Sequence, residues 1–371
     1  MKTKTVNWSS YRIVFSAVVF VALLASAGTA SAQAIIKVND TVNLRFGILM
    51  QDWADWQQTQ ASGATTGYAQ NLYIRRFRIL MAGTVAKNVT FFMETDNANL
   101  GKAPKALGTG FFLQDAFLNW KIANEFSIDA GLILIPLCRN CTESAITQLV
   151  LDYGSFSFLE SGVTQSTVGR DTGFQARGYL AGNRLEYRAG AYQGIRQAGS
   201  HNSFRFTGRL QYNFLDTEVG PFYAGNYLGK KKVFALGASY DTQSAYKAYS
   251  VDGFLSLPVA GKNGLTGEFD YIHYDGGETF TTLLKQNTIM GQVGFLFAGP
   301  ELMPFFRYES QSFTDDVNKK GNSRNIHVGL GWFPHGHWFN IKAAYTNRQK
   351  PNDSSTANTS EFTLQLQLAY F

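Results

Sequence analysis

The sequence has 371 residues, of which 15% are aromatic, 36 are glycine and only two are cysteine, and its formal net charge at pH 7 is +6. Part of this charge belongs to the first 32 residues, which hold three of the 33 Lys and Arg and no acidic residue. Residues 33–371 therefore carry 30 basic and 27 acidic side chains, a net charge of +3. A charge this small excludes nucleic acid as an expected partner.

The N-terminus is typical of a secretory signal peptide, which we predict over residues 1–32. It has a positive region (Lys2, Lys4 and Arg12), an apolar core of about a dozen residues over 13–25, and a small-residue cleavage site at Ala30-Ser31-Ala32. The core is shorter than the roughly 20 apolar residues of a spanning helix, and no later segment supplies one. We therefore expect an exported protein whose mature part is residues 33–371.

The mature part consists of segments in which apolar and polar residues alternate, the period of a β-strand. In the first segment Leu44, Phe46 and Ile48 share one face, while Asn43 and Arg45 lie on the other. Sixteen such segments are predicted, near 42–51, 72–86, 89–96, 112–122, 126–134, 174–180, 185–191, 204–214, 231–242, 245–257, 264–274, 286–298, 302–313, 323–333, 337–348 and 360–371. An even number suits an all-β, transmembrane, antiparallel up-and-down β-barrel. The mean hydropathy of −0.14 agrees with this fold, because lipid-facing and lumen-facing residues cancel.

The connections between these segments give a second test of a barrel. Long outer loops should alternate with short inner turns. The polar stretch 59–69 predicts the first outer loop, and residues 87–88 predict a tight inner turn. Two connections break the rule, because 242–245 is too short for an outer loop and 215–230 is too long for an inner turn.

The third outer connection, residues 136–170, is the one long stretch without alternation. Loops of some 35 residues are uncommon in compact domains unless they are functional or disordered. Its apolar residues, including Ile146, Leu149 and Phe156, argue against disorder. We predict that this segment folds into the barrel and narrows it as a constriction loop.

The last predicted strand indicates the compartment. Phe362, Leu364, Leu366 and Leu368 alternate with polar residues, and the chain stops at Phe371. An amphipathic final strand that ends on an aromatic residue is typical of proteins assembled into the outer membrane of Gram-negative bacteria. We therefore expect export through the periplasm to the outer membrane, with its lipid as a partner.

Three stretches resemble the phosphate-selective porin O and P family of Gram-negative porins. Residues 72–78 (LYIRRFR) with Gly83 are similar to the arginine-rich second strand of that family. Asp115-Ala116-Phe117-Leu118 resembles a later strand start, and residues 126–136 with 155–160 resemble the strand and inward loop. The resemblance implies a sixteen-stranded, trimeric outer-membrane channel for small anions such as phosphate. One departure is that residues 136–170 hold no lysine, whereas phosphate-selective members line this loop with lysines.

Basic residues on the polar faces of the strands are the clearest chemical signal. Arg76 and Arg78 are two residues apart, so they point the same way about 7 Å apart, and rings of Arg or Lys suit anion pores. The predicted pore-lining residues are Arg45, Arg76, Arg78, Lys121, Arg177, Arg188, Arg205, Arg209 and Arg307; those of the constriction loop are Arg139, Glu143, Asp152, Glu160 and Arg170. Alternatively, the basic residues pair with acids on the same faces, such as Glu94, Asp96, Asp115, Asp129, Glu186, Asp270 and Glu309.

The two cysteines, Cys138 and Cys141, open the predicted constriction loop. Export to an oxidising compartment favours a disulfide between them, and two ligands do not make a tetrahedral zinc site. His335 and His337 fall in a predicted turn and are expected to be exposed, so no metal site is predicted. No motif of a hydrolase, metalloprotease or nucleotide-binding site is present, and neither an enzyme nor a cofactor is expected.

The aromatic residues near strand ends predict interfacial girdles. These are Trp53, Trp56, Tyr73, Trp120, Tyr212, Trp332, Trp338 and Tyr370, whereas Phe117 and Tyr192 fall on the polar face. The hypothesis is a passive, anion-favouring channel, expected as a homotrimer. The alternatives are a weakly selective general porin and a barrel that does not conduct and acts as a scaffold or receptor.

Overall fold

The computed structural model describes residues 34–61, 64–108, 110–157, 160–196 and 201–371, so the predicted signal peptide lies outside the described residues. The strands are β1 (Ala34–Lys37), β2 (Asn43–Ala61), β3 (Ala64–Ala86), β4 (Val89–Asp96), β5 (Phe112–Lys121), β6 (Ser127–Leu134), β7 (Arg170–Leu180), β8 (Leu185–Tyr192), β9 (Arg205–Asn213), β10 (Val233–Gln243), β11 (Tyr246–Val259), β12 (Asn263–Asp275), β13 (Gln286–Leu296), β14 (Leu302–Phe313), β15 (Ser323–Trp332), β16 (Phe339–Gln349) and β17 (Thr359–Tyr370).

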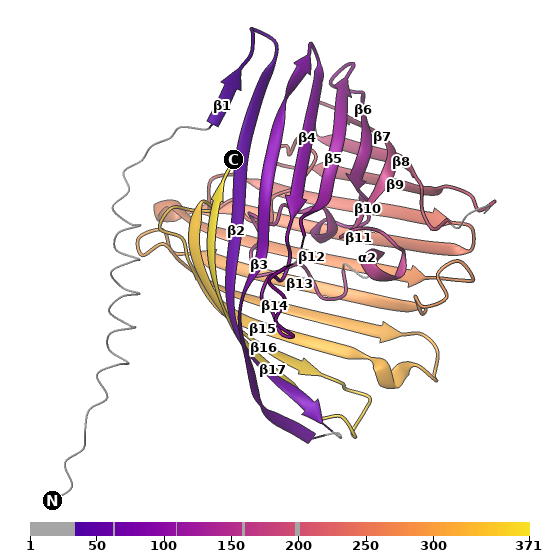
Figure 1. Ribbon diagram of the computed structural model, residues 1–371, viewed down its shortest axis with the longest axis vertical. Helices are drawn as coiled ribbons and strands as arrows, with labels where there is room; N and C mark the ends of the chain where they lie inside the picture. Colours follow the sequence, from indigo (N-terminus) through magenta and orange to yellow (C-terminus); the bar gives the residue numbers. More distant parts are fainter. Residues whose placement is uncertain (1–33, 62–63, 109, 158–159, 197–200) are drawn as a thin grey trace, which may run out of the picture. The chain divides into compact units, whose positions relative to one another are not determined.

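Strands β2 to β17 form a closed antiparallel barrel (Figure 1). Each strand pairs with the next in the chain, and β17 pairs with β2 to close the sheet, while the short β1 pairs with β2. Closure leaves no unpaired edge among these sixteen strands. The prediction of a sixteen-stranded up-and-down barrel is confirmed.

The alternation of the sequence corresponds to the two faces of the wall. In β9 the side chains of Arg205 and Arg209 are buried in the interior, whereas those of Phe206 and Leu210 are 50% and 56% exposed on the outside. Successive side chains of a strand point to opposite faces, so a polar interior and an apolar exterior require this pattern. The exterior is therefore suited to lipid.

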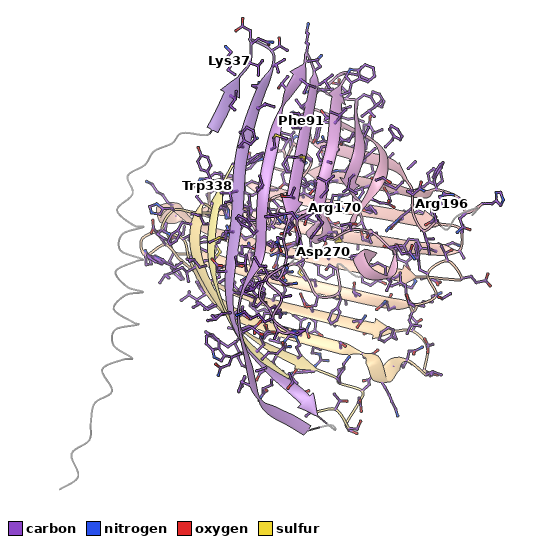
Figure 2. The ribbon with its side chains drawn as sticks, in the orientation of Figure 1. Lys37, Phe91, Arg170, Arg196, Asp270 and Trp338 are labelled. Carbon is purple, nitrogen blue, oxygen red and sulfur yellow. A yellow bond between two sulfur atoms is a disulfide. The ribbon has the colours of Figure 1, made fainter. Side chains whose placement is uncertain are left out.

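The two ends of the barrel differ in the length of their connections. Short turns such as 87–88 and 181–184 lie at one end, which we take as the inner (periplasmic) end, and longer loops lie at the other. Figure 2 shows Arg196 at the outer end and Trp338 at the inner end. Both exceptions noted in the sequence are present, since β10 and β11 are joined by two residues and β9 and β10 by residues 214–232.

The predicted loop at 59–69 is wrong. Strand β2 continues to Ala61 and β3 starts at Ala64, with Gln60 paired to Thr65 across the hairpin, and residues 62–63 lie outside the described residues. Polar composition suggested a loop, but backbone pairing with the neighbouring strand extends both strands. The hairpin thus continues as a paired ribbon of β2 and β3 beyond Gln57, where the pairing of β2 with β17 ends.

In the part of the chain that the structure describes, helical structure is limited to single turns: η1 (Asn140–Thr142), α2 (Glu160–Val163), η2 (Ala260–Lys262) and η3 (Lys319–Gly321). Among the described residues, none of the helices has the length and apolar character needed to cross a membrane.

The core lies inside the ring of strands, where two connections fold inward. One is residues 135–169 between β6 and β7, here called the constriction segment, which crosses the enclosed space (Figure 1). The other is residues 214–232 between β9 and β10, here called the inner segment. Leu137 packs against Tyr246 and Ile272 of the wall, and Leu149 packs against Phe333. The predicted inward loop is therefore present, one residue earlier than its predicted bounds.

Candidate functional site

The constriction segment is held in place by polar side chains of the barrel wall. Lys342 of β16 donates through Nζ to the carbonyl oxygens of Gln148 and Val150, the latter at 3.0 Å. Arg307 of β14 donates through Nη1 to the carbonyl oxygen of Asp152 at 2.8 Å. A segment without sheet pairing leaves its backbone groups unsatisfied, and buried donors on the wall supply the missing partners. These contacts fix the segment against one side of the lumen.

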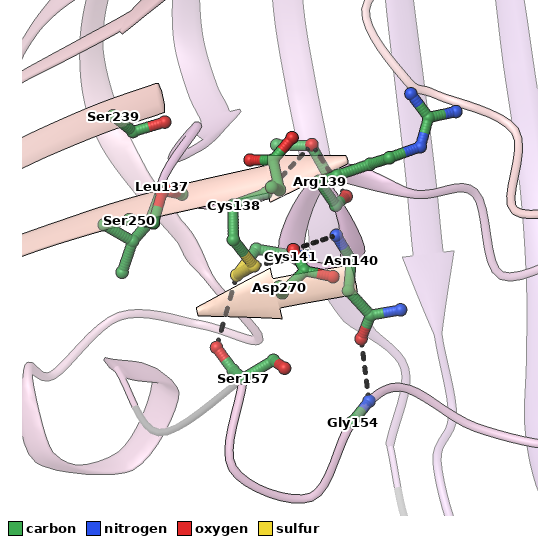
Figure 3. Close-up of a disulfide and its surroundings, with 12 residues drawn as sticks. Leu137, Cys138, Arg139, Asn140, Cys141, Gly154, Ser157, Ser239, Ser250 and Asp270 are labelled. Atoms are coloured by element: carbon green, nitrogen blue, oxygen red, sulfur yellow. Dashed lines mark hydrogen bonds between the residues drawn. A yellow bond between two sulfur atoms is a disulfide. The ribbon is translucent and has the colours of Figure 1, made fainter. Parts of the chain in front are cut away.

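The start of the constriction segment is a tight turn closed by a disulfide between Cys138 and Cys141 (Figure 3). The turn contains η1, and its Thr142 hydroxyl donates to the carbonyl oxygen of Cys138 at 2.8 Å. The amide N–H of Asn140 donates to Asp270 on β12 at 3.3 Å. The disulfide therefore stiffens the part of the segment that contacts the far wall.

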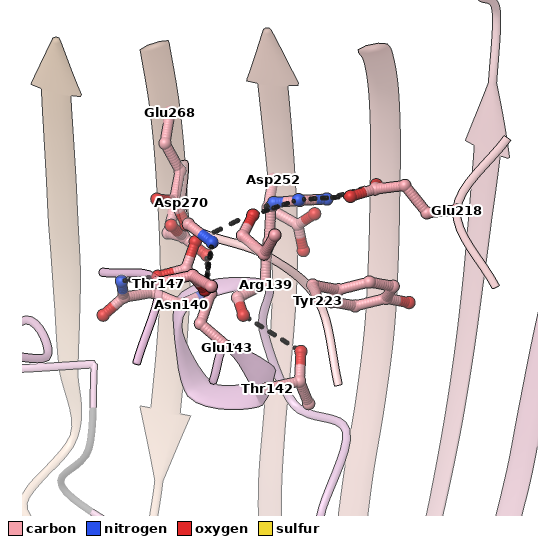
Figure 4. A network of polar contacts seen from close by, with 12 residues as sticks. Arg139, Asn140, Thr142, Glu143, Thr147, Glu218, Tyr223, Asp252, Glu268 and Asp270 are labelled. Carbon is pink, nitrogen blue, oxygen red and sulfur yellow. Dashed lines mark hydrogen bonds and ion pairs between the residues drawn. The ribbon is translucent and has the colours of Figure 1, made fainter. Parts of the chain in front are cut away.

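The inner segment meets the constriction segment in the middle of the barrel. Arg139 donates through Nη1 and Nη2 to the two carboxylate oxygens of Glu218, each at 2.8 Å, and both side chains are buried (Figure 4). The backbone N–H of Ser144 donates to the carbonyl oxygen of Tyr223. The backbone N–H of Tyr223 donates in turn to the carbonyl oxygen of Thr142. The two segments thus form one plug that fills part of the lumen.

A buried acidic residue lies on the same segment beside this contact. Glu143 is within 4.0 Å of Arg139 Nε, and Glu268 and Asp270 of β12 lie nearby (Figure 4). Burial raises the pKa of the Glu143 carboxyl to about 7, because removing water penalises its charged form more than Arg139 stabilises it. The charge of this group therefore changes near neutral pH.

A bulge in β3 turns one extra basic side chain toward the lumen. Arg76 pairs with Gln51 and Ile74 pairs with Asp52, so Arg75 is an additional residue in the strand. A bulge of this kind re-aims the neighbouring side chains. As a result Arg75 and Arg76 both contact Asp152 of the constriction segment, Arg75 at 2.7 Å.

Three cavities follow one another along the wall beside the plug. The outer cavity has a volume of 350 Å³ and is lined by residues including Arg75, Lys102 and Tyr153. The neck has a volume of 80 Å³ and shares Tyr153 with the outer cavity. The inner cavity has a volume of 580 Å³ and shares Phe92, Phe222 and Phe371 with the neck. Neighbouring cavities share wall residues, so the three cavities lie in a row from the outer to the inner end, and this row is here called the lateral path.

Basic residues outnumber acidic residues along this lateral path. Its lining contains eight Arg and Lys side chains: Arg75, Lys102, Arg307 and Arg348 in the outer cavity, Arg78 and Arg170 in the neck, and Arg45 and Arg177 in the inner cavity. Four acidic side chains line it: Asp152 and Glu361 in the outer cavity, and Glu94 and Glu143 in the neck. The inner cavity lining includes no acidic residue.

Most arginines of the interior are paired with carboxylates. The pairs are Arg78 with Glu94 and Asp96, Arg170 with Asp115, Arg177 with Asp129, Arg188 with Glu186, Arg205 with Asp241, Arg209 with Asp252, and Arg307 with Glu309. Arg45 is different, because within the described part of the chain it has no carboxylate partner and lies 4.3 Å from the ring centre of Phe371. Pairing thus neutralises much of the arginine charge, whereas Arg45 forms no ion pair with a side-chain carboxylate of the described residues.

The sequence profile of the phosphate-selective porin O and P family matches residues 42–244, more than half of the chain. The chain belongs to this family. A comparison with curated proteins finds no match.

The barrel is similar to the solved structure of OmpF from Salmonella typhi in complex with daunomycin, with a TM-score of 0.60, 13% identity, and 91% of this chain and 100% of that chain covered. It is similar to the anion-selective porin from Comamonas acidovorans, with a TM-score of 0.59, 12% identity, and coverage of 89% and 99%. It is also similar to the outer membrane channel DcaP of Acinetobacter baumannii, with a TM-score of 0.58, 11% identity, and coverage of 90% and 99%. The protein is an outer-membrane β-barrel porin.

The predicted basic residues of this porin fall into three groups. Seven are buried in the interior: Arg76, Arg78, Arg177, Arg188, Arg205, Arg209 and Arg307. Of these, Arg78, Arg177 and Arg307 line the lateral path. Arg45 is half-buried in the inner cavity, whereas Lys121 is exposed at the inner end of β5 and lines none of these three cavities.

The predicted residues of the constriction loop are also divided. Glu143, Asp152 and Arg170 line the lateral path, whereas Arg139 is directed away from it toward Glu218. The side chain of Glu160 lies outside the described residues. The sequence reasoning missed Arg75, Lys102, Arg348 and Lys342. Lys342 and Arg348 could have been found, because the alternation of polar and apolar residues in β16 places both of them on its polar face.

The prediction of an interfacial girdle is wrong for Trp53 and Tyr73. Both line the outer cavity, where their ring centres are 6.1 Å apart, and Trp53 donates through Nε1 to the buried Gln365 at 2.9 Å. Trp53 follows the buried Gln51 by two residues and so lies on the inner face of β2, whereas the extra residue Arg75 moves Tyr73 of β3 to the inner face. Other aromatic residues of the predicted girdle, Trp120, Tyr212, Trp332 and Trp338, are exposed. Phe117 and Tyr192 are buried inside the barrel, as their parity predicts.

The histidine pair at the inner end does not form a common site. His335 is exposed, and His337 contacts the carbonyl oxygen of Asn226 in the inner segment through Nε2 at 2.9 Å. Within the described residues no cluster of three His, Cys, Asp or Glu has the arrangement of a metal site.

Proposed function

We propose that this porin is a passive channel that favours small anions, phosphate among them, and that solutes follow the lateral path. The observation that carries the proposal is the excess of basic residues along the path, eight against four, with no acidic residue lining the inner cavity. Arginine keeps its charge at any working pH, and rings of Arg or Lys favour anions over cations in a pore. The transport needs no cofactor and no catalytic group.

The preference for anions is expected to be modest. Each paired arginine lies beside a carboxylate of opposite charge, and an ion pair produces a weaker electric field at a distance than a lone cation. The constriction segment also lacks the lysines expected of phosphate-selective members. These features support a channel for small anions in general, and a weakly selective general porin is the alternative.

We propose in addition that residues 1–32 are a signal peptide, that the protein is exported through the periplasm, and that it assembles as a homotrimer in outer-membrane lipid. The exposed apolar residues of the wall, such as Phe174 and Leu210, support contact with lipid. The trimer is supported by the fold, since OmpT of Vibrio cholerae, which has a similar fold (TM-score 0.51, 12% identity), was solved in a trimer form.

The test is a measurement of the reversal potential of the purified protein in a planar bilayer across a KCl gradient. The variant Arg45→Gln/Lys102→Gln removes one cation from each end of the lateral path and should move the reversal potential toward zero. The control Lys121→Gln/Arg184→Gln makes the same charge change at residues that line none of the three cavities, and should leave the reversal potential unchanged. Equal permeability of both ions in the wild type would favour the general porin, and folded protein without conductance would overturn the channel proposal.

A further inference from the structure

The inner cavity combines the guanidinium of Arg45, which pairs with no side-chain carboxylate of the described residues, with a cluster of aromatic rings. Phe92 of β4 lies at the centre of this cluster, with ring-centre distances of 5.8 Å to Phe117, 5.3 Å to Phe222 and 5.9 Å to Phe371. The four rings come from β4, β5, the inner segment and the C-terminal residue. Distant parts of the chain thus build one aromatic corner at the inner end of the lateral path.

The rings do not close the space beside them. Here a cavity of 580 Å³ remains next to the four rings, and its lining includes Arg45 and Arg177 as well as Asn43 and Asn119. The cavity therefore presents aromatic faces, a guanidinium group and amide groups together.

Arg45 is placed to bind an anion in this cavity. Its guanidinium lies over the Phe371 ring at 4.3 Å, and within the described residues no carboxylate pairs with it. The planar guanidinium offers two parallel N–H donors to a carboxylate, and the neighbouring rings offer edges and faces to an aromatic group. A hydrated inorganic anion would bind the guanidinium but would make no use of the aromatic rings.

We propose that the inner cavity is a binding site for small aromatic carboxylates, with the carboxylate on Arg45 and the ring against Phe92 and Phe222. This inference rests on the proposed channel function and names the class of anion that the path holds best. The neck on the outer side has a volume of 80 Å³, against 580 Å³ for the inner cavity. Such an anion therefore reaches the cavity more readily from the inner end.

The test measures block of chloride current in a planar bilayer containing channels of known orientation. Benzoate added on the inner side should reduce the current at concentrations about tenfold below those needed on the outer side. Acetate, which has the charge without the ring, and benzamide, which has the ring without the charge, should each be at least about tenfold weaker than benzoate.

Two variants test the assignment of the site. Arg45→Gln and Phe92→Leu should each weaken benzoate block about tenfold relative to the chloride current of the same variant, whereas Lys121→Gln should keep the wild-type block. Equal block by benzoate and acetate in a conducting wild-type channel would overturn the aromatic carboxylate site and leave the channel proposal intact. This comparison uses only the wild type, so it decides the question even if a variant fails to fold. Folded protein that does not conduct chloride would instead refute the channel proposal itself.

Discussion

The ion pair between Arg139 and Glu218 should control how firmly the two inward segments hold each other. Both side chains are buried, with exposed fractions of 0% and 3%, and two hydrogen bonds of 2.8 Å join them. The change Glu218→Gln leaves a buried guanidinium whose nearest remaining carboxylate is Glu143 at 4.0 Å. Breaking one side of a buried pair costs about 3–5 kcal/mol. We therefore expect the contact between the segments to weaken by about 3 kcal/mol.

Hydrogen exchange of two backbone amides measures this loss. The N–H groups of Ser144 and Tyr223 join the two segments, so they exchange only when the segments separate. A loss of about 3 kcal/mol corresponds to exchange that is roughly a hundredfold faster. In the double variant Arg139→Met/Glu218→Gln these amides should exchange more slowly than the sum of the two single-variant effects predicts, because neither member of the pair is left as an unpaired charge. Glu361→Gln, which breaks a pair within the wall, is the control. Unchanged exchange in Glu218→Gln, or strict additivity in the double variant, would refute this reasoning.

Three further changes test other parts of the interior. Lys342→Met removes the donor to two carbonyl oxygens of the constriction segment and should destabilise that segment by about 1–3 kcal/mol, measured by amide exchange within it. Because burial raises the pKa of Glu143 to about 7, this carboxyl is mostly neutral at pH 6 and negative at pH 8. Anion preference should therefore fall as pH rises from 6 to 8, and Glu143→Gln should reduce this pH dependence of the reversal potential. Cys138→Ser/Cys141→Ser opens a loop with a sequence separation of 3 and should cost about 2 kcal/mol in the segment, seen as faster proteolysis that reduction of the wild type reproduces.

The wall of the barrel could be predicted because each strand carries its own evidence. Alternation in β9 separates Arg205 and Arg209 from Phe206 and Leu210 within nine residues, so no long-range information is needed. The constriction segment was predictable for the opposite reason, since its length and missing alternation exclude it from the wall. Both inferences use only the local pattern and the known length of ordinary connections.

The inner segment could not be predicted as part of the plug. Its sequence was noted only as too long for an inner turn, and its role depends on partners far away in the chain. Glu218 pairs with Arg139, 79 residues earlier, and Tyr223 bonds with backbone groups of the constriction segment. Such contacts follow from the closed barrel and cannot be read from the segment itself.

The register of β3 also could not be predicted from the sequence. One extra residue, Arg75, reverses the faces of the residues on one side of the bulge. Strict alternation placed Tyr73 at the interface, whereas the bulged strand turns it into the outer cavity. The same shift turns Arg75 toward Asp152, a contact that alternation alone would exclude. A bulge leaves no clear mark in a strand whose residues are mostly compatible with either face.

The pairing of the interior charges changes how selectivity should be inferred from a porin sequence. Counting arginines on the polar faces suggests a strongly positive lumen, but acids on neighbouring strands pair with most of them, as Asp129 does with Arg177 at 3.2 Å. A pair separated by about 3 Å acts as a dipole, and salt screens the interaction of exposed charges beyond about 8 Å at physiological ionic strength. A passing ion therefore responds mainly to cations without a partner and to those whose N–H groups face the path. Arg45 belongs to the first kind, and selectivity should depend on it more than on the larger paired set.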